Sequence, residues 1–261
     1  MPRFELDKRR VQSSFGNASH SYDAMAQLQR NIGEQLLKNP PKLQGTVVDV
    51  GCGTGFLTQK LQQQGGYQQL IALDIAPQML TVSQKKLADQ SIVYLCADAE
   101  ALPLANQSVD YLFSNVAIQW CQQLDRLFSG FREVLKQGGE LHCSTFSTAT
   151  LQELKQAWAS VDDYQHVNTF YNAEQLQQAL QQAGFNHIHC ETQQYLSEYP
   201  DVMSLMKQLK GIGARNVNNG RKKQLTTKSQ LQTLINNYPQ SLDTSTITAT
   251  FEVVYLMAKV G

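Results

Sequence analysis

The chain has 261 residues, enough for one large α/β domain, and we expect such a domain to carry an inserted cap. Lys plus Arg and Asp plus Glu both number 22, so the net charge predicts neither nucleic acid nor a membrane surface as a partner. The five cysteines are scattered without a Cys-x-x-Cys pair, which argues against a metal site or a disulfide framework. Because there is also no signal-peptide pattern and no membrane-spanning apolar run, we expect a cytoplasmic protein.

Residues 1–45 are expected to form a helical segment that precedes the first strand. Apolar residues recur at helical spacing from Tyr22 to Leu37, and a pair of prolines then ends the pattern. The stretch 13–23 is polar and rich in Ser, Asn and Gly. We expect a loop there, which lies either at the surface or as a flap over a ligand.

Residues 46–58, TVVDVGCGTGFLT, predict a buried strand, a tight turn and the start of a helix. Valines surround Asp49, as in a strand that is covered on both faces of a parallel sheet. Gly51, Gly53 and Gly55 can adopt positive φ and let the backbone approach a ligand closely. The stretch therefore predicts a small polar ligand at the carboxyl end of this strand, against the amino terminus of the helix.

Strands and helices then alternate up to about residue 150. A helix is expected to begin at Pro77, another to span residues 124–135, and residues 136–139 to form a turn before the next strand. Further strands are expected at residues 70–76, 91–98, 109–115 and 140–146. This alternation predicts a doubly wound, mostly parallel sheet of the Rossmann-like kind, with residues 46–150 as its ligand-binding core.

Residues 151–261 are expected to complete a seven-stranded sheet and to add the cap. Glutamine-rich helices are predicted at 151–161 and 173–185, followed by a strand at 187–199 and a helix at 201–214. The closing strand, 246–259, is apolar enough to lie in the sheet interior. We expect the cap and a substrate region at about residues 200–240.

Two classes of ligand use a glycine turn of this kind. The dinucleotide fingerprint G-x-G-x-x-G places a third glycine beneath a pyrophosphate, whereas here the pattern is G-x-G-x-G and Phe56 stands at the sixth position. With Asp49 included, the form D-x-G-x-G-x-G resembles the first motif of the class I S-adenosylmethionine-dependent methyltransferases. The cationic sulfonium and ammonium of that cofactor favour a nearby carboxylate such as Asp49. A nicotinamide or flavin protein is the alternative.

The resemblance extends to the ends of the following strands. Asp74 stands 19 positions after Gly55, where a nucleoside site uses an acid to hold ribose hydroxyls. The resemblance implies S-adenosylmethionine as the cofactor, no metal, and an adenine that contacts Asp98 and Ala99. The expected cofactor-binding residues are Tyr22, Asp49, Gly51, Cys52, Gly53, Gly55, Asp74, Ile75, Met79, Asp98, Ala99, Asn115 and Val116. Taken singly, Asp49 could instead be a satisfied polar residue at a strand end, and Asn115 a turn former.

Segments outside the glycine core resemble the malonyl-acyl-carrier-protein O-methyltransferases of biotin synthesis. They are residues 13–37, 114–121, 209–217 and 248–260. The resemblance implies methyl transfer to the free carboxylate of malonyl-acyl carrier protein, an early step toward the pimeloyl unit. A different small carboxylate, quinone or phenolic acceptor is the alternative, followed by a NAD-binding oxidoreductase or a cofactor-binding protein without activity. Whether a coenzyme A thioester is also accepted stays open.

A malonyl carboxylate is ionised at neutral pH, so its attack on a sulfonium methyl requires no general base. Catalysis then depends on alignment and desolvation, and the five histidines, which have no partner pattern, are interpreted as ordinary surface or core residues. Arg215 is the candidate for gripping the carboxylate, since a guanidinium binds it in a fork, unless it simply belongs to a solvated loop. Tyr22 is expected to close over the cofactor as a flap residue or to pack the N-terminal helix, and Trp120 to line the acyl side or the core.

A basic run between residues 207 and 228 contains no Asp or Glu. Acyl carrier proteins are acidic, so such a surface would steer the carrier toward the pocket. The expected docking residues are Lys207, Lys210, Arg215, Arg221, Lys222 and Lys223. The alternative is a solvated loop with no partner.

Overall fold

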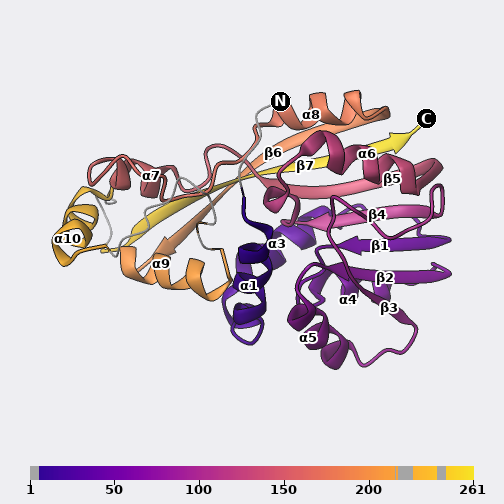
Figure 1. Ribbon diagram of the computed structural model, residues 1–261, viewed down its shortest axis with the longest axis horizontal. Helices are drawn as coiled ribbons and strands as arrows, with labels where there is room; N and C mark the ends of the chain where they lie inside the picture. The colour runs from indigo at the N-terminus through magenta and orange to yellow at the C-terminus, as the bar shows by residue number, and fades with distance from the viewer. Residues whose placement is uncertain (1–5, 215, 217–225, 240–244) are drawn as a thin grey trace.

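A seven-stranded open sheet in the order β3-β2-β1-β4-β5-β7-β6 runs through the protein (Figure 1). The computed structural model describes residues 6–214, 216, 226–239 and 245–261. The first five strands in the order pair in parallel, while β7 is antiparallel to both β5 and β6. The strands are β1 (Thr46–Val50), β2 (Gln69–Asp74), β3 (Ile92–Cys96), β4 (Val109–Asn115), β5 (Leu135–Phe146), β6 (Phe185–Tyr199) and β7 (Ile247–Val260). This architecture confirms the predicted doubly wound, mostly parallel sheet.

Helices cover both faces of the sheet and form two separate hydrophobic cores. On one face α6 and α8 pack against the sheet, and on the other α3, α4 and α5 do so. The helices are α1 (Lys8–Ala18), α2 (Tyr22–Met25), α3 (Gln27–Leu36), α4 (Phe56–Gln64), α5 (Pro77–Leu87), α6 (Leu124–Val134), α7 (Gln152–Ala159), α8 (Ala173–Gln182), α9 (Val202–Gly211) and α10 (Lys228–Asn237), with a 3₁₀ turn at Ile118–Trp120. Within the described ranges, none of them combines the length and the apolar character that crossing a membrane requires.

The strand order reverses between β1 and β4, because β1 lies between β2 and β4. At such a switch point the connections leave in opposite directions and open a crevice at the carboxyl ends of the strands. Val47, Val48 and Val50 are fully buried, as the apolar pattern of β1 predicted. Figure 1 shows α1 and α3 at the end of the sheet toward which β1 points. The fold therefore places the glycine turn, which follows β1, in this crevice.

Two sequence-based expectations about local structure are wrong. Residues 13–18, expected in a loop, belong to α1, because the Asp7 side chain caps this helix by accepting hydrogen bonds from the Arg9 and Arg10 amides. Val11 and Phe15 also anchor α1 in a small apolar cluster with Trp120. Residues 136–139, expected as a turn, are part of β5.

The cap forms a third hydrophobic core at the far ends of two long strands. Strands β6 and β7 extend beyond the parallel part of the sheet, and α7, α9 and α10 gather on that extension (Figure 1). Helix α7 therefore belongs to the cap together with α9 and α10, whereas α8 packs on β6 and α6. The cap lies beside α2, since α2 and α9 are in contact.

Candidate cofactor and acceptor site

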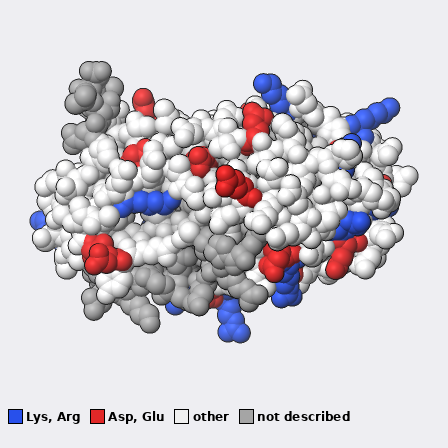
Figure 2. All heavy atoms as spheres, turned by 90° about the horizontal axis from the view of Figure 1, so that it is seen from above, with Lys and Arg blue, Asp and Glu red and all other residues white. Residues whose placement is uncertain are grey.

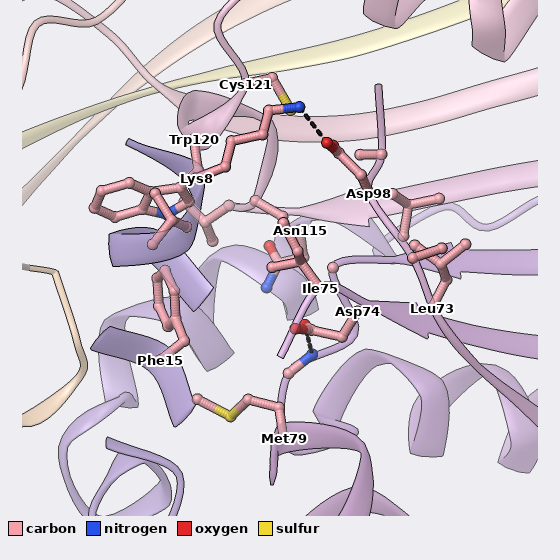
Figure 3. Close-up of a pocket in the computed structure, with 18 of the residues that line it drawn as sticks. Lys8, Phe15, Leu73, Asp74, Ile75, Met79, Asp98, Asn115, Trp120 and Cys121 are labelled. Carbon is pink, nitrogen blue, oxygen red and sulfur yellow. Dashed lines mark hydrogen bonds and ion pairs between the residues drawn. The ribbon is translucent and has the colours of Figure 1, made fainter. Parts of the chain in front are cut away.

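A cavity of about 90 Å³ lies at the carboxyl ends of β1, β2 and β4 and is closed by α1 (Figure 3). We call it the nucleoside cavity. Ten of the thirteen residues expected to bind a cofactor line it: Tyr22, Gly51, Gly53, Asp74, Ile75, Met79, Asp98, Ala99, Asn115 and Val116. Parallel strands bring their carboxyl ends to one edge of a sheet, and the structure brings these residues together for that reason.

Asp74 ties the glycine turn to the end of β2. One carboxylate oxygen accepts a hydrogen bond from the Gly53 amide at 2.9 Å, and the other accepts from the Ala76 amide at 2.8 Å. Burial raises the pKa of Asp74 above its ordinary value, and these backbone hydrogen bonds oppose that shift. Each carboxylate oxygen has capacity for a further donor, so Asp74 can accept hydrogen bonds from both hydroxyls of a ribose.

Lys8, at the start of α1, closes the other side of the nucleoside cavity. Its ammonium forms an ion pair with Asp98 (Figure 3) and a second one with the buried Glu100. Glu100 also accepts hydrogen bonds from the backbone amides of Gln122 and Gln123 at 3.1 and 2.7 Å. Although burial opposes the charge, the two carboxylates raise the pKa of Lys8 above its ordinary value. Lys8 thus fastens α1 across the cavity.

Replacing Lys8 by Met is expected to weaken cofactor binding about tenfold, because Glu100 then stays buried without its cation and α1 loses its attachment. Isothermal titration of the variant with S-adenosylmethionine measures the change. Arg9→Met is the matched control, since Arg9 is the exposed neighbour of Lys8 on the same helix. Equal dissociation constants for the two variants would contradict a role for Lys8 in closing the cavity.

A second cavity, of about 40 Å³, adjoins the first on the far side of the glycine turn. We call it the amino-acid cavity. Asp49, Cys52, Gln29 and Arg30 line it, and it shares Tyr22, Gly51, Gly53 and Asn115 with the nucleoside cavity. Two buried oxygens on its walls, Asp49 Oδ1 and Gln29 Oε1, have no hydrogen-bond partner among the described residues. Unsatisfied buried acceptors of this kind fit a ligand that carries a donating group such as an ammonium.

Asp49 is buried at the end of β1 and its second oxygen accepts a hydrogen bond from Thr58 Oγ1 at 2.6 Å. Burial raises the pKa of Asp49 to about 7, the Asp74 charge adds to the rise, and the Thr58 hydrogen bond opposes it. Asp49 is therefore a carboxyl group that a cationic ligand would convert to its ionised form.

Arg30 supplies the positive charge of the amino-acid cavity. Its guanidinium donates to the Asp23 carbonyl oxygen at 2.7 Å and to Gln27 Oε1 at 2.8 Å, which orients it from α3. Lys8, Gln29 and Arg30 were not predicted from the sequence. Gln29 and Arg30 had one signal only, a position inside a segment that carries the family resemblance, and Lys8 had none, because each acts on a strand end that is distant in the chain.

The two cavities together fit an elongated ligand that has a nucleoside at one end and an amino acid at the other. Gly53 lies where they meet, and a Cβ built on it would have no atom within 4 Å. Gly53 therefore leaves open the space through which such a ligand would pass. Gly55 lines neither cavity. Its φ of +86° and the approach of Ser83 Oγ to 2.2 Å from a built Cβ give it a role in helix packing instead.

A third cavity, of about 70 Å³, lies between the core and the cap. It touches the nucleoside cavity through Trp120 and the amino-acid cavity through Gln29. Phe15 of α1 packs edge-on against Trp120 with ring centroids 5.2 Å apart. Trp120, expected on the acyl side, therefore forms a wall between the nucleoside cavity and the third cavity.

Of the other expected acceptor residues, the two that the structure describes line none of these cavities. Lys207 and Lys210 line an open groove along α9. Arg215, Arg221, Lys222 and Lys223 lie outside the described residues. Among the residues that the structure describes, no group of three or more His, Cys, Asp or Glu could hold a metal ion.

Two histidines with largely buried side chains lie within hydrogen-bonding distance of carboxylates that the sequence did not indicate. His142 stacks on Phe113, and its Nε2 lies 2.9 Å from Glu140, while burial lowers its pKa. His166 stacks on Trp158 with ring centroids 3.7 Å apart, and its Nε2 lies 2.6 Å from Asp162. His142 is a core residue, as interpreted, whereas His166 lines the third cavity.

Residues 48–143 match the family model described as "Methyltransferase domain". The chain is 41% identical over 256 residues to malonyl-[acyl-carrier protein] O-methyltransferase of Methylococcus capsulatus, an alignment that covers 95% of this chain and 92% of that protein. It is 37% identical over 254 residues to the protein of the same name from Hahella chejuensis, covering 97% and 91%. It is also 41% identical over 257 residues to biotin biosynthesis bifunctional protein BioHC of Cellvibrio japonicus, where the alignment covers 97% of this chain but only 50% of the relative.

Solved structures share the fold at low sequence identity. Phosphoethanolamine N-methyltransferase 2 of Haemonchus contortus, solved with S-adenosyl-L-methionine, superposes with a TM-score of 0.57 at 17% identity, covering 94% of this chain and 57% of that one. The YcgJ protein from Bacillus subtilis gives 0.61 at 14% identity, covering 87% and 97%. These two likenesses support the same architecture.

Proposed function

Because the chain belongs to the malonyl-[acyl-carrier protein] O-methyltransferase family and is an S-adenosylmethionine-dependent methyltransferase, we propose that it methylates the free carboxylate of malonyl-acyl carrier protein. The observation that carries the proposal is the 41% identity to a relative of that name over 92% of its length. Methyl esterification removes the charge of the malonyl group and would commit it to biotin synthesis.

S-Adenosylmethionine, when bound, supplies a methyl group on a positively charged sulfur, and transfer to a carboxylate oxygen leaves a neutral thioether. The protein's task is to hold, align and desolvate the two reactants. Asp74 would accept the ribose hydroxyls, and Asp98 with Ala99 would border the adenine, since all three line the nucleoside cavity. Asp49 would hold the ammonium group and Arg30 the carboxylate of the amino-acid end.

Tyr22 and Arg215 are proposed as positioning residues. Tyr22 lines both cofactor cavities, and burial together with the charges of Asp74 and Asp23 raises its pKa far above the ordinary value. Its phenol therefore stays protonated at neutral pH and acts as a donor and a wall. Arg215 would grip the acyl carboxylate. This proposal is supported by its chain neighbours Ala214 and Asn216, which both line the third cavity.

The decisive assay incubates the protein with cofactor labelled on its methyl group and with malonyl, succinyl or acetyl carrier protein. We expect label on malonyl carrier protein and none on acetyl carrier protein, which has no free carboxylate. Label on the acetyl form, or on none of the three, would contradict the proposal. A parallel reaction with malonyl-coenzyme A tests whether the carrier itself is needed, and calorimetry with NAD tests the oxidoreductase alternative.

Carrier docking is proposed on the cap, at the basic run of residues 207–228. On the face drawn in Figure 2, basic and acidic side chains are dispersed among uncharged ones. The described residues of that face thus offer no extended basic patch for an acidic carrier. Lys207 and Lys210, the first two basic residues of this run, lie on α9 and line an open groove. A docking surface there would be local, in keeping with a net charge of zero.

Reversing Lys222 and Lys223 to Glu is expected to raise the apparent KM for malonyl carrier protein about tenfold, with kcat and cofactor affinity unchanged. Steady-state kinetics at two salt concentrations measures the effect, which should shrink at high salt because exposed charges are screened. Lys85→Glu combined with Arg126→Glu changes the same amount of charge on exposed residues of α5 and α6. An equal KM for the two double variants would contradict a docking surface at Lys222 and Lys223.

A further inference from the structure

Gln29 stands at the junction between the cofactor cavities and the third cavity. It lies on α3 and lines both the amino-acid cavity and the third cavity. Its backbone oxygen accepts a hydrogen bond from Asn115 Nδ2 at 2.9 Å, and Asn115 Oδ1 in turn accepts from Ser144 Oγ at 2.8 Å. This chain of hydrogen bonds fixes α3 to the ends of β4 and β5. The backbone position of Gln29 is therefore set by the core of the protein.

The Gln29 side chain has hydrogen-bonding capacity that the described residues leave unused. Its Oε1 is buried without a partner. An amide offers both an acceptor oxygen and donating N–H groups, and it carries no net charge. It can therefore accept from a cationic ligand on one side and donate to an anionic ligand on the other.

The third cavity has the size and lining for a short acyl group. Phe146 packs against Phe170 and Phe251 with ring centroids 6.0 and 5.8 Å apart, and Trp120 completes the aromatic walls. A volume of about 70 Å³ accommodates roughly five or six water-sized groups. A malonyl unit has six non-hydrogen atoms beyond its thioester sulfur. Apolar walls would exclude water from a carboxylate that enters, which strengthens its reactivity.

We infer that the third cavity is the chamber for a short, carboxylate-bearing acyl group, and that Gln29 positions this group against the cofactor. The Gln29 oxygen accepts from the cofactor's ammonium, and its N–H groups donate to the acyl carboxylate. Phe146, Phe170 and Phe251 limit the length of the acyl chain. This inference rests on the proposed function and adds the residues that orient and select the acceptor.

The substitution Gln29→Glu tests the contact to the cofactor and the contact to the acyl carboxylate separately. It preserves the shape of the side chain and adds one negative charge. We expect the variant to bind S-adenosylmethionine at least as tightly as the unmodified protein. Its kcat/KM for malonyl carrier protein should fall on the order of a hundredfold, because two like charges would meet in a dry site. The matched control is Gln35→Glu on the same helix, which lines none of the three cavities. Activity of Gln29→Glu equal to that of this control would overturn the positioning role, and so would a loss of turnover explained by weaker cofactor binding.

The chamber walls are tested by acyl selectivity. Phe170→Leu is expected to raise the ratio of succinyl to malonyl carrier methylation about tenfold, because one added methylene then fits. Phe131→Leu removes the same atoms from a fully buried position in the core of α6, away from the cavity, and should leave the ratio unchanged. The ratio is insensitive to a partial loss of folded enzyme. If the unmodified enzyme methylates no carrier, the proposed function fails and the inference with it. If the unmodified enzyme methylates malonyl carrier protein but Phe170→Leu keeps the original ratio, the proposed function stands and only the assignment of the third cavity as the acyl chamber is contradicted.

Discussion

Affinity for S-adenosylmethionine is expected to rise more than tenfold between about pH 5.5 and about pH 7.5, and to lose this dependence in Asp49→Asn. The physical cause is the burial of Asp49, which raises its pKa to about 7. Below that pH the carboxyl group of the ligand-free protein is protonated and neutral, so it offers no charge to a cationic ligand. Binding an ammonium group beside it requires the proton to leave.

The sign of the effect follows from that proton release. Each pH unit below the pKa of Asp49 makes release less favourable and weakens binding by up to about tenfold. Above the pKa, Asp49 is already ionised and the affinity levels off. The range ends near pH 7.5 because an α-amino group itself loses its proton at about 7.7–8.0.

Calorimetric titrations in buffers of different ionisation enthalpy measure both the affinity and the protons released. We expect close to one proton released per ligand at pH 5.5 for the unmodified protein and none from this site for Asp49→Asn. Asp110→Asn is a suitable control, since Asp110 pairs with Lys136 at 2.6 Å and lies outside the cavities. A persistent pH slope in Asp49→Asn would assign the titration to another group, such as Asp74, whose pKa burial also raises.

The fold, the glycine turn and the residues at the strand ends could be predicted because they depend on local patterns. Apolar β-branched runs predicted strands, and parallel strands bring their carboxyl ends to one edge, so Asp74, Asp98 and Asn115 had to meet there. Glycine spacing favoured S-adenosylmethionine over a dinucleotide as the cofactor. Each of these arguments needed only neighbouring residues and a rule of sheet topology.

The missed residues depend on contacts between distant parts of the chain. Lys8 reaches Asp98 across 90 positions, and no local pattern marks a lysine as a partner of a particular carboxylate. Gln29 lies on an amphipathic helix whose pattern predicts only which face is buried. Residues 13–18 were expected in a loop because Ser, Asn and Gly are poor helix formers, yet tertiary packing of α1 over the cavity overrides that preference.

The third cavity could not be predicted, since its walls come from segments that are far apart in the sequence. Trp120, Phe146, Phe170 and Phe251 meet only because β7 returns between β5 and β6 and carries the cap with it. An isolated aromatic residue is more often part of a core than of a binding site. The third cavity thus depends on how distant segments are brought together by the fold, whereas the glycine turn is formed by one local stretch of sequence.

Gly53→Ala is expected to fold normally and to weaken cofactor binding by roughly tenfold to a hundredfold, since overpacking by one methyl group typically costs about 1–3 kcal/mol. Gly53 has a φ of +54°, which alanine tolerates at a modest cost, and a built Cβ has no atom within 4 Å. The new methyl group would therefore occupy space that belongs to the ligand, at the junction of the two cofactor cavities. Thermal unfolding should show a small decrease in Tm, whereas calorimetry should show a large loss of affinity.

Two further glycine variants separate the backbone effect from the effect on the site. Gly138→Ala meets the same kind of backbone strain, with a φ of +76° and no atom within 4 Å of a built Cβ, but lies on an exposed part of β5. It should lower Tm slightly and leave cofactor affinity unchanged. Gly55→Ala should instead destabilise the fold, because its Cβ would stand 2.2 Å from Ser83 Oγ at a φ of +86°. If Gly53→Ala bound the cofactor as well as Gly138→Ala did, the ligand would not cross the glycine turn at Gly53, and the two cavities would not hold one continuous molecule.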